Sequence, residues 1–83
     1  MKVNPQAVFR KEIDGNSLLF DPDSGATFGM NKTSTFLWEK FAEGLDEAAA
    51  LAALREVCDN MPPDAEKHVA DFVAALKAKK FLL

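Results

Sequence analysis

The sequence predicts a small α+β domain in which a three-stranded antiparallel sheet is followed by three helices, an order written βββααα. Apolar residues alternate before residue 30 and recur at helical spacing after it. Turn-forming residues divide the first part, and helix caps and helix-ending residues divide the second. At 83 residues, we expect a single domain over residues 1–83 with a modest core.

The predicted strands are separated by two turns of recognisable chemistry. They cover residues 7–13, 18–20 and 26–30. Residues 14–16, Asp-Gly-Asn, tolerate positive φ and indicate a hairpin. In the second turn Pro22 presets φ and Gly25 accepts a left-handed conformation. Residues 1–6 lack periodicity and contain Pro5, so we expect a loose segment there.

Each predicted helix has its own boundary signals. Asn31 and Asp46 offer side-chain oxygens to the free N–H groups of the first and second helices. Gly44 ends the first helix, and the proline-containing run 59–63 ends the second. Pro63 suits the first turn of the third. The expected inward-facing residues are Phe36, Leu37, Trp38, Phe41, Leu51, Leu54, Cys58, Ala65, Val69, Phe72, Val73 and Leu76. The apolar residues 81–83 should return to this core.

Composition excludes several classes of function. A net charge of −3 argues against a nucleic-acid surface, which needs clustered Lys and Arg. The second helix would read DNA in a winged-helix arrangement, but it carries Arg55 among several acids. No apolar run approaches a membrane span and no signal peptide is recognisable. The single Cys58 cannot form an internal disulfide, which is consistent with a cytoplasmic protein.

The run Phe20–Trp38, FDPDSGATFGMNKTSTFLW, carries a family resemblance. An acidic turn with Pro and Gly, a strand with an aromatic residue, then Asn, a hydroxyl residue and an aliphatic-Trp pair follow in order. The positions concerned are Asp21, Pro22, Asp23, Gly25, Phe28, Asn31, Thr33, Leu37 and Trp38. This run resembles the signature of the PqqD family of pyrroloquinoline quinone biosynthesis. Ser34 departs from it, at a place where Gly is expected, and Ser is tolerated early in a helix.

The resemblance, which covers nearly the whole chain, implies a winged-helix-like peptide chaperone, also called a recognition element for ribosomally made, modified peptides. Such a protein binds the leader segment of a precursor peptide and presents it to a modifying enzyme, commonly a radical S-adenosylmethionine (SAM) enzyme. The leader would lie antiparallel along the third strand, in an apolar groove walled by the third helix. The implied peptide-binding residues are Thr27, Phe28, Gly29, Met30, His68, Val69, Phe72, Ala75, Leu76 and Lys79.

Several of these residues also have simpler interpretations. Gly29 permits close approach of a second backbone or marks a bulge. Helical spacing favours a core role for Val69, Val73 and Leu76. We expect His68 on a solvated helix face, because no cluster of metal ligands accompanies it. Lys79 belongs to a C-terminal lysine group that compensates the helix dipole, and it is also placed to meet an acidic leader residue.

Several other residues also have structural explanations. Asp21 and Asp23 are explained by a turn, Trp38 by the core, and Cys58 by packing. No catalytic pair, phosphate loop or metal cluster is recognisable, so we expect neither an enzyme nor a cofactor. A non-catalytic scaffold for another enzyme or a kinase-linked protein would leave the same pattern. An exposed strand edge would also permit a homodimer.

Overall fold

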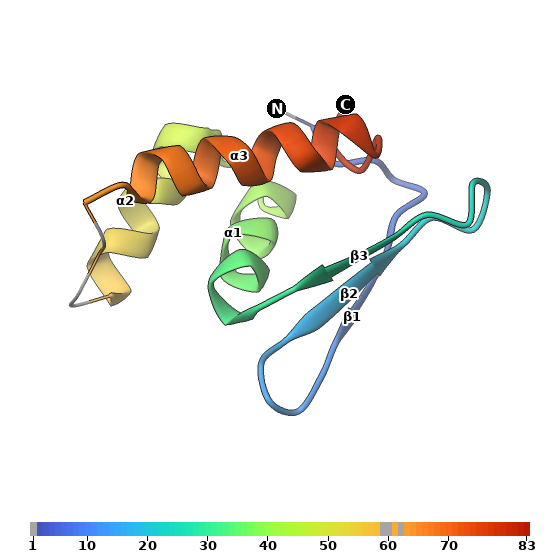
Figure 1. The fold of residues 1–83 in the computed structure, drawn as a ribbon, viewed down its shortest axis with the longest axis horizontal. Helices are drawn as coiled ribbons and strands as arrows, with labels where there is room; N and C mark the ends of the chain where they lie inside the picture. The colour runs from blue at the N-terminus through green and yellow to red at the C-terminus, as the bar shows by residue number, and fades with distance from the viewer. Residues whose placement is uncertain (1, 59–60, 62) are drawn as a thin grey trace.

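The computed structural model describes residues 2–58, 61 and 63–83, and its elements follow the predicted βββααα order (Figure 1). They are β1 Val8–Lys11, β2 Ser17–Phe20, β3 Thr27–Met30, α1 Lys32–Ala42, α2 Glu47–Val57 and α3 Ala65–Ala78. Figure 1 shows α3 passing above β3, with α1 beginning where β3 ends. The predicted α+β class is confirmed, with β1 and β3 shorter than the predicted segments and β2 one residue longer.

The sheet is an antiparallel meander in the order β1-β2-β3. Its two turns use the expected glycines, with φ of +90° at Gly15 and +76° at Gly25. Residues of β2 and β3 pair one to one, and Leu18 lies opposite Gly29. This continuous register shows that the bulge interpretation of Gly29 was wrong, because a bulge would place two residues opposite one.

The two faces of the sheet have different surroundings. Phe9, Leu19 and Phe28 lie side by side in the register and face the helices, with Leu19 fully buried. Neighbouring residues point to the opposite face because side chains alternate along a strand. That outer face carries the partly exposed apolar side chains Val8, Leu18 and Phe20. The helices therefore cover one face of the sheet only.

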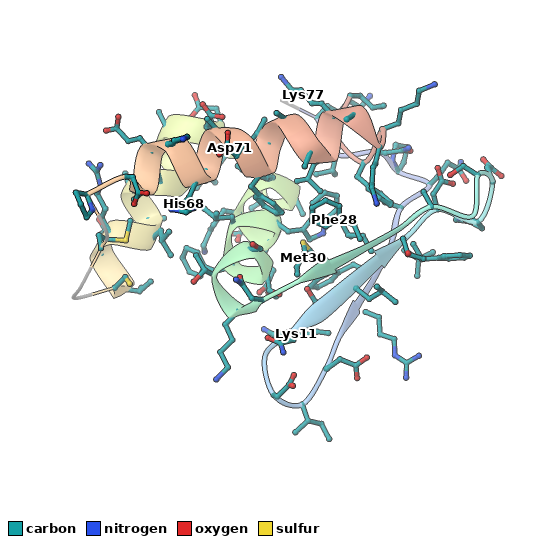
Figure 2. The ribbon with its side chains drawn as sticks, viewed as in Figure 1. Lys11, Phe28, Met30, His68, Asp71 and Lys77 are labelled. Carbon is teal, nitrogen blue, oxygen red and sulfur yellow. The ribbon has the colours of Figure 1, made fainter. Side chains whose placement is uncertain are left out.

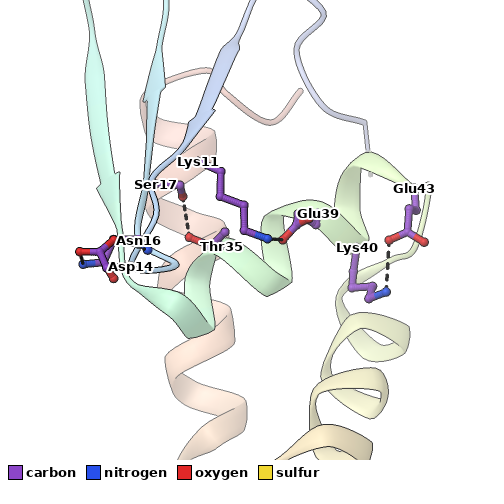
Figure 3. Close-up of polar contacts among 8 residues, drawn as sticks. All are labelled: Lys11, Asp14, Asn16, Ser17, Thr35, Glu39, Lys40 and Glu43. Atoms are coloured by element: carbon purple, nitrogen blue, oxygen red, sulfur yellow. Dashed lines mark hydrogen bonds and ion pairs between the residues drawn. The ribbon is translucent and has the colours of Figure 1, made fainter.

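The first helix is held to the sheet at its start and along its side. Asn31 caps it as predicted, with Oδ1 accepting a hydrogen bond from the Ser34 N–H at 2.8 Å. The buried Ser17 and Thr35 hydroxyls are hydrogen-bonded to each other, and Lys11 Nζ lies 3.3 Å from Glu39 Oε1 (Figure 3). The two side-chain contacts orient α1 against β2 and β1.

The second helix begins as predicted but ends earlier than the apolar pattern indicated. Asp46 caps it by accepting from the Ala49 N–H at 2.8 Å. Its buried residues are Ala50 and Leu54, whereas Leu51 is half-buried. Cys58 follows the helix in extended conformation and is half-buried, so its placement within the inner helical stripe was wrong. Of the run predicted to end α2, residues 59, 60 and 62 lie outside the described residues.

The first and third helices complete the core around the predicted apolar positions. Gly44, with φ of +100°, ends α1 as expected. The third helix begins at Ala65, so Pro63 lies in the turn before it instead of in its first turn. The buried members of the core are Leu19, Met30, Leu37, Trp38, Phe41, Ala50, Leu54, Val69, Val73, Leu76, Phe81 and Leu82. The core interpretation of Trp38, Val69, Val73 and Leu76 is confirmed.

The N-terminal segment pairs with the C-terminal segment. Val3 forms a β-bridge with Leu82, and Asn4 N–H donates to the Phe81 carbonyl at 2.8 Å. The expectation of a loose segment was therefore wrong for these residues. The return of residues 81–83 is confirmed for Phe81 and Leu82, which are buried, whereas Leu83 is exposed. A positive φ of 64° at Lys80 turns the chain back toward the core.

Candidate functional site

The open edge of β3, defined as the outward-facing backbone groups of Thr27 and Gly29, is the first component of the site. The Asp21 N–H donates to the Ala26 carbonyl across the β2–β3 turn. In an antiparallel pair hydrogen-bonded and non-bonded residue pairs alternate, and each residue directs its N–H and C=O to the same side. Phe28 and Met30 therefore bond to β2, whereas Thr27 and Gly29 direct their backbone groups away from it. The pairing of β1 with β2 agrees with this assignment. There the Glu12 N–H donates to the Asn16 carbonyl, so Leu18 and Phe20 bond to β1 and leave the other residues of β2 to bond to β3.

Lys79 contacts this edge at one end. Its ammonium donates to the Thr27 carbonyl at 2.9 Å, which confirms that this carbonyl faces outward. The same ammonium lies 5.5 Å from the centre of the Phe28 ring, within cation–π range. Thr27 and Lys79 are 52 residues apart in sequence, and the chain brings them together where the end of α3 approaches β3.

An aromatic cluster joins β3 to the helices behind the edge. The Phe28 ring lies 5.9 Å from Phe72 of α3 and 6.4 Å from Phe81, and Phe72 stacks on Phe41 at 6.3 Å. Figure 2 shows Phe28 directed from β3 toward α3. Phe28 and Phe72 are half-buried, whereas Phe41 and Phe81 belong to the core. Each half-buried ring thus contacts the core and retains an accessible part.

A pocket of about 370 Å³ opens near the other end of β3, between the start of α1, the end of α2 and the first half of α3. Its deeper wall is apolar and its entrance carries polar groups. It is lined by Asn31, Thr33, Ser34, Leu37, Leu54, Cys58, Met61, Ala65, His68, Val69 and Phe72. This volume is within the range of small-ligand pockets and is ample for apolar peptide side chains.

The predicted peptide-binding residues fall into three groups. Thr27, Gly29 and Lys79 are exposed at the open edge or contact it, and Phe28 lies behind it. His68, Val69 and Phe72 line the pocket. Ala75 is half-buried on α3, whereas Met30 and Leu76 are buried in the core and support the other residues from behind.

His68 lies on the exposed side of α3, as expected. Its Nε2 is 3.0 Å from Asp64 Oδ2, one helical turn away. Figure 2 shows it near the N-terminal end of α3, where it contributes to the pocket entrance. Within residues 2–58, 61 and 63–83, no group of three or more His, Cys, Asp or Glu is arranged to hold a metal ion.

Sequence reasoning missed much of the pocket lining. Asn31 and Ser34 were interpreted as helix-start residues, and Leu37 and Leu54 as core. Cys58 and Met61 come from the end of α2 and the connection that follows it. The pocket combines three helix ends, and no periodic signal in one segment describes such a surface. The useful signal was the cap at Asn31, because it places the start of α1 directly after β3.

No helix in the part of the chain that the structure describes combines the length and the apolar character needed to span a membrane. A second hollow, of about 390 Å³, lies between α2 and α3 and is bordered by the exposed Arg55–Glu66 ion pair. The residues that line this second hollow do not include any residue of the open edge of β3.

Two solved structures resemble this fold over nearly its whole length. TbiB1 in complex with the TbiA(beta) leader peptide matches with a TM-score of 0.84 and 26% identity, over 99% of this chain and 94% of that chain. Lasso peptide synthetase B1 complexed with the leader peptide matches with a TM-score of 0.81 and 23% identity, over 99% and 95%. A comparison with curated proteins gives no match. The second likeness concerns the fold alone.

The family model for "Coenzyme PQQ synthesis protein D (PqqD)" matches residues 16–82. The match includes β2, β3, all three helices and the returning Phe81. It thus contains the open edge, Lys79 and the pocket described above. The chain belongs to the PqqD family.

Proposed function

We propose that this protein binds the leader segment of a ribosomally made precursor peptide by adding it as a strand to the open edge of β3, and then presents it to a modifying enzyme. The observation that carries the proposal is the outward direction of the Thr27 and Gly29 backbone groups beside an apolar pocket. A strand with such an edge accepts another strand through main-chain hydrogen bonds. The complex of TbiB1 with the TbiA(beta) leader peptide supports the proposal by analogy.

Binding energies indicate that edge and pocket act together. Thr27 and Gly29 each offer one N–H and one C=O, four groups in all, at a net gain of about 1 kcal/mol per hydrogen bond. Micromolar affinity requires about 8 kcal/mol. Burial of an apolar side chain supplies about 1.5–3 kcal/mol, so one or two peptide side chains in the pocket provide most of the remainder. The edge then sets the backbone alignment, and the pocket adds affinity and selectivity.

An antiparallel leader has a defined direction on this surface. It would begin near Met30 and the pocket and leave near Thr27 and Lys79. Its anchoring side chains would therefore precede the paired segment in the peptide sequence. Its C-terminal continuation, toward the part to be modified, would emerge beside the end of α3.

We assign the chain a non-catalytic role in which the chemistry belongs to the partner. We propose a radical SAM enzyme as that partner, as the family resemblance implies, and pyrroloquinoline quinone synthesis, which the description of the family names, as one candidate pathway. We propose that the protein performs this role in the cytoplasm. A homodimer formed through the open edge would compete with the leader, so peptide binding and edge-to-edge self-association exclude each other in this proposal.

The test is an amide NMR titration with the synthetic leader of the precursor peptide encoded beside the gene. We expect micromolar affinity and shifts that concentrate on residues 25–30 and 68–79. Gly29→Pro removes an outward N–H without removing a β2–β3 hydrogen bond, so it should weaken binding about tenfold in a folded protein. Gly29→Ala is the matched control. It keeps the N–H, and an added Cβ meets nothing within 4 Å.

Two results would contradict the proposal. The first is an absence of shifts at millimolar peptide in the folded wild-type protein. The second is binding that Gly29→Pro leaves unchanged, which would place the peptide elsewhere than on the open edge. Retained two-dimensional NMR dispersion in Gly29→Pro would show that weaker binding by this variant does not come from loss of the fold.

A further inference from the structure

We propose that Lys79 is a specificity-determining residue. Its ammonium donates a hydrogen bond to the Thr27 carbonyl in the free protein, and it moves to a carboxylate of the peptide when a strand is added. The inference rests on the proposed function and names a class of peptide. The preferred peptide carries Asp or Glu at the residue after the one that faces Thr27, because the side chain of that residue points to the helix side of the sheet, where the Lys79 ammonium lies.

The geometry of the free protein supplies the first step. The Lys79 ammonium lies 2.9 Å from the Thr27 carbonyl, which is one of the groups that an incoming strand needs. Among the described residues no carboxylate lies within 4 Å of this ammonium. A lysine on a strand edge also discourages pairing with unrelated strands.

Displacement of the ammonium supplies the second step. When a peptide N–H bonds to the Thr27 carbonyl, the lysine loses this acceptor. Its side chain is long, and the contact with the Phe28 ring at 5.5 Å keeps it at the same end of the edge. A peptide carboxylate there restores a charge-assisted hydrogen bond, whereas an amide restores a weaker one and a peptide lysine repels it.

Lys77 provides a matched control on the same helix. It is exposed and lies two residues from Lys79 in the last turn of α3. Figure 2 shows it on the side of α3 that faces away from the sheet. Lys77→Met and Lys79→Met change the net charge equally. A difference between them therefore reports the local contact and not the overall charge of the protein.

The first measurement uses the free protein and needs no peptide. We expect Lys79→Met to shift the Thr27 carbonyl ¹³C signal upfield, because a hydrogen bond to that oxygen is lost, while Lys77→Met leaves it in place. Lys79→Arg, which keeps a donor and a positive charge, should retain most of the wild-type shift. An identical Thr27 signal in wild type and Lys79→Met overturns the proposal at this step.

The second measurement compares three versions of the same synthetic leader, with Glu, Gln or Lys at the residue after the one that NOEs place opposite Thr27, whose side chain points to the helix side of the sheet. Wild type should bind the Glu version about two- to fivefold more tightly than the Gln version, as expected for a partly exposed ion pair, and the Lys version least. Lys79→Met should abolish the Glu-over-Gln preference, Lys77→Met should keep it, and high salt should reduce it.

The outcomes separate this inference from the proposed function. If wild type binds all three versions equally, or if Lys79→Met keeps the preference, leader binding stands and the role of Lys79 is overturned. If none of the versions binds the folded wild-type protein, the proposed function is contradicted, and the specificity role is contradicted with it.

Discussion

At the scale of single residues, Ser17 and Thr35 form a buried polar link between the sheet and α1. Both are buried, and their hydroxyls bond to each other (Figure 3). Removing one partner leaves the other hydroxyl away from water without a hydrogen bond. Removing both with retention of shape avoids that cost.

We therefore predict non-additive substitutions at this pair. Ser17→Ala alone should lower the free energy of unfolding by about 1–3 kcal/mol, and Thr35→Val alone by a similar amount. The double variant should lose clearly less than the sum of the two, which chemical denaturation of the four proteins measures. Additive losses would show that the two hydroxyls are independent in solution.

Lys80 occupies a backbone conformation that favours glycine. Its φ of 64° lies in the left-handed region, which costs a residue with a Cβ about 1 kcal/mol or more. Lys80→Gly should raise the free energy of unfolding by about 1 kcal/mol. Lys77→Gly, inside α3, should lower it by a similar amount. Thermal unfolding of both variants checks the opposite signs, and destabilisation by Lys80→Gly would refute the prediction.

At the scale of elements, the direct passage from β3 to α1 depends on the cap at Asn31. The Asn31 side chain accepts from the Ser34 N–H, and this junction also borders the pocket. Ser34, where the family resemblance led us to expect Gly, contributes through its backbone N–H. A residue of either type supplies this donor, so the departure is compatible with the cap.

Loss of the cap should destabilise the protein, and a different hydrogen-bond acceptor at position 31 should restore most of the stability. We predict that Asn31→Ala costs about 1 kcal/mol of unfolding free energy, because one N–H at the start of α1 loses its partner. Asn31→Asp keeps the acceptor and should cost little. Urea denaturation of the two variants makes the comparison, and equal losses would argue against capping as the cause.

The elements themselves were largely predictable because their signals are local. Asn31, Gly44 and Asp46 act within a few residues of the helix ends that they mark. Cys58 was misplaced because a helical apolar pattern continues past the point where α2 ends. The assignment of Gly29 as a regular strand residue required the register, which a single glycine does not reveal.

At the scale of the whole molecule, the contacts that sequence reasoning missed join distant segments. The Asn4 N–H reaches the Phe81 carbonyl, and the Lys79 ammonium reaches the Thr27 carbonyl. No spacing rule connects residues so far apart. The resemblance placed Lys79 among the candidates, but its bond to the strand edge emerged only from the packing of the end of α3 against β3.

Pairing of the terminal segments should contribute measurably to stability. A chain that begins at Gln6 loses the Asn4 bonds to Phe81 and Lys80 and the bond from Leu83 N–H to the Lys2 carbonyl. At about 1 kcal/mol for each bond, we predict a loss of about 2–3 kcal/mol of unfolding free energy. Denaturation measures the loss, and amide exchange at Leu83 should accelerate. Unchanged exchange would mean that this pairing is absent in solution.

The alternating direction of backbone groups along β3 has a consequence for the evolution of proteins that bind leader peptides in the proposed way. In the proposed binding mode, main-chain bonds from Thr27 and Gly29 do not depend on the side chains of the bound segment. Precursors of divergent sequence can thus share one docking mode while differing at an anchor and at a single charge. Retargeting then needs substitutions at the exposed rim of the pocket and at Lys79, positions that lie outside the buried core. A change of precursor peptide would therefore leave the residues that stabilise the fold unchanged.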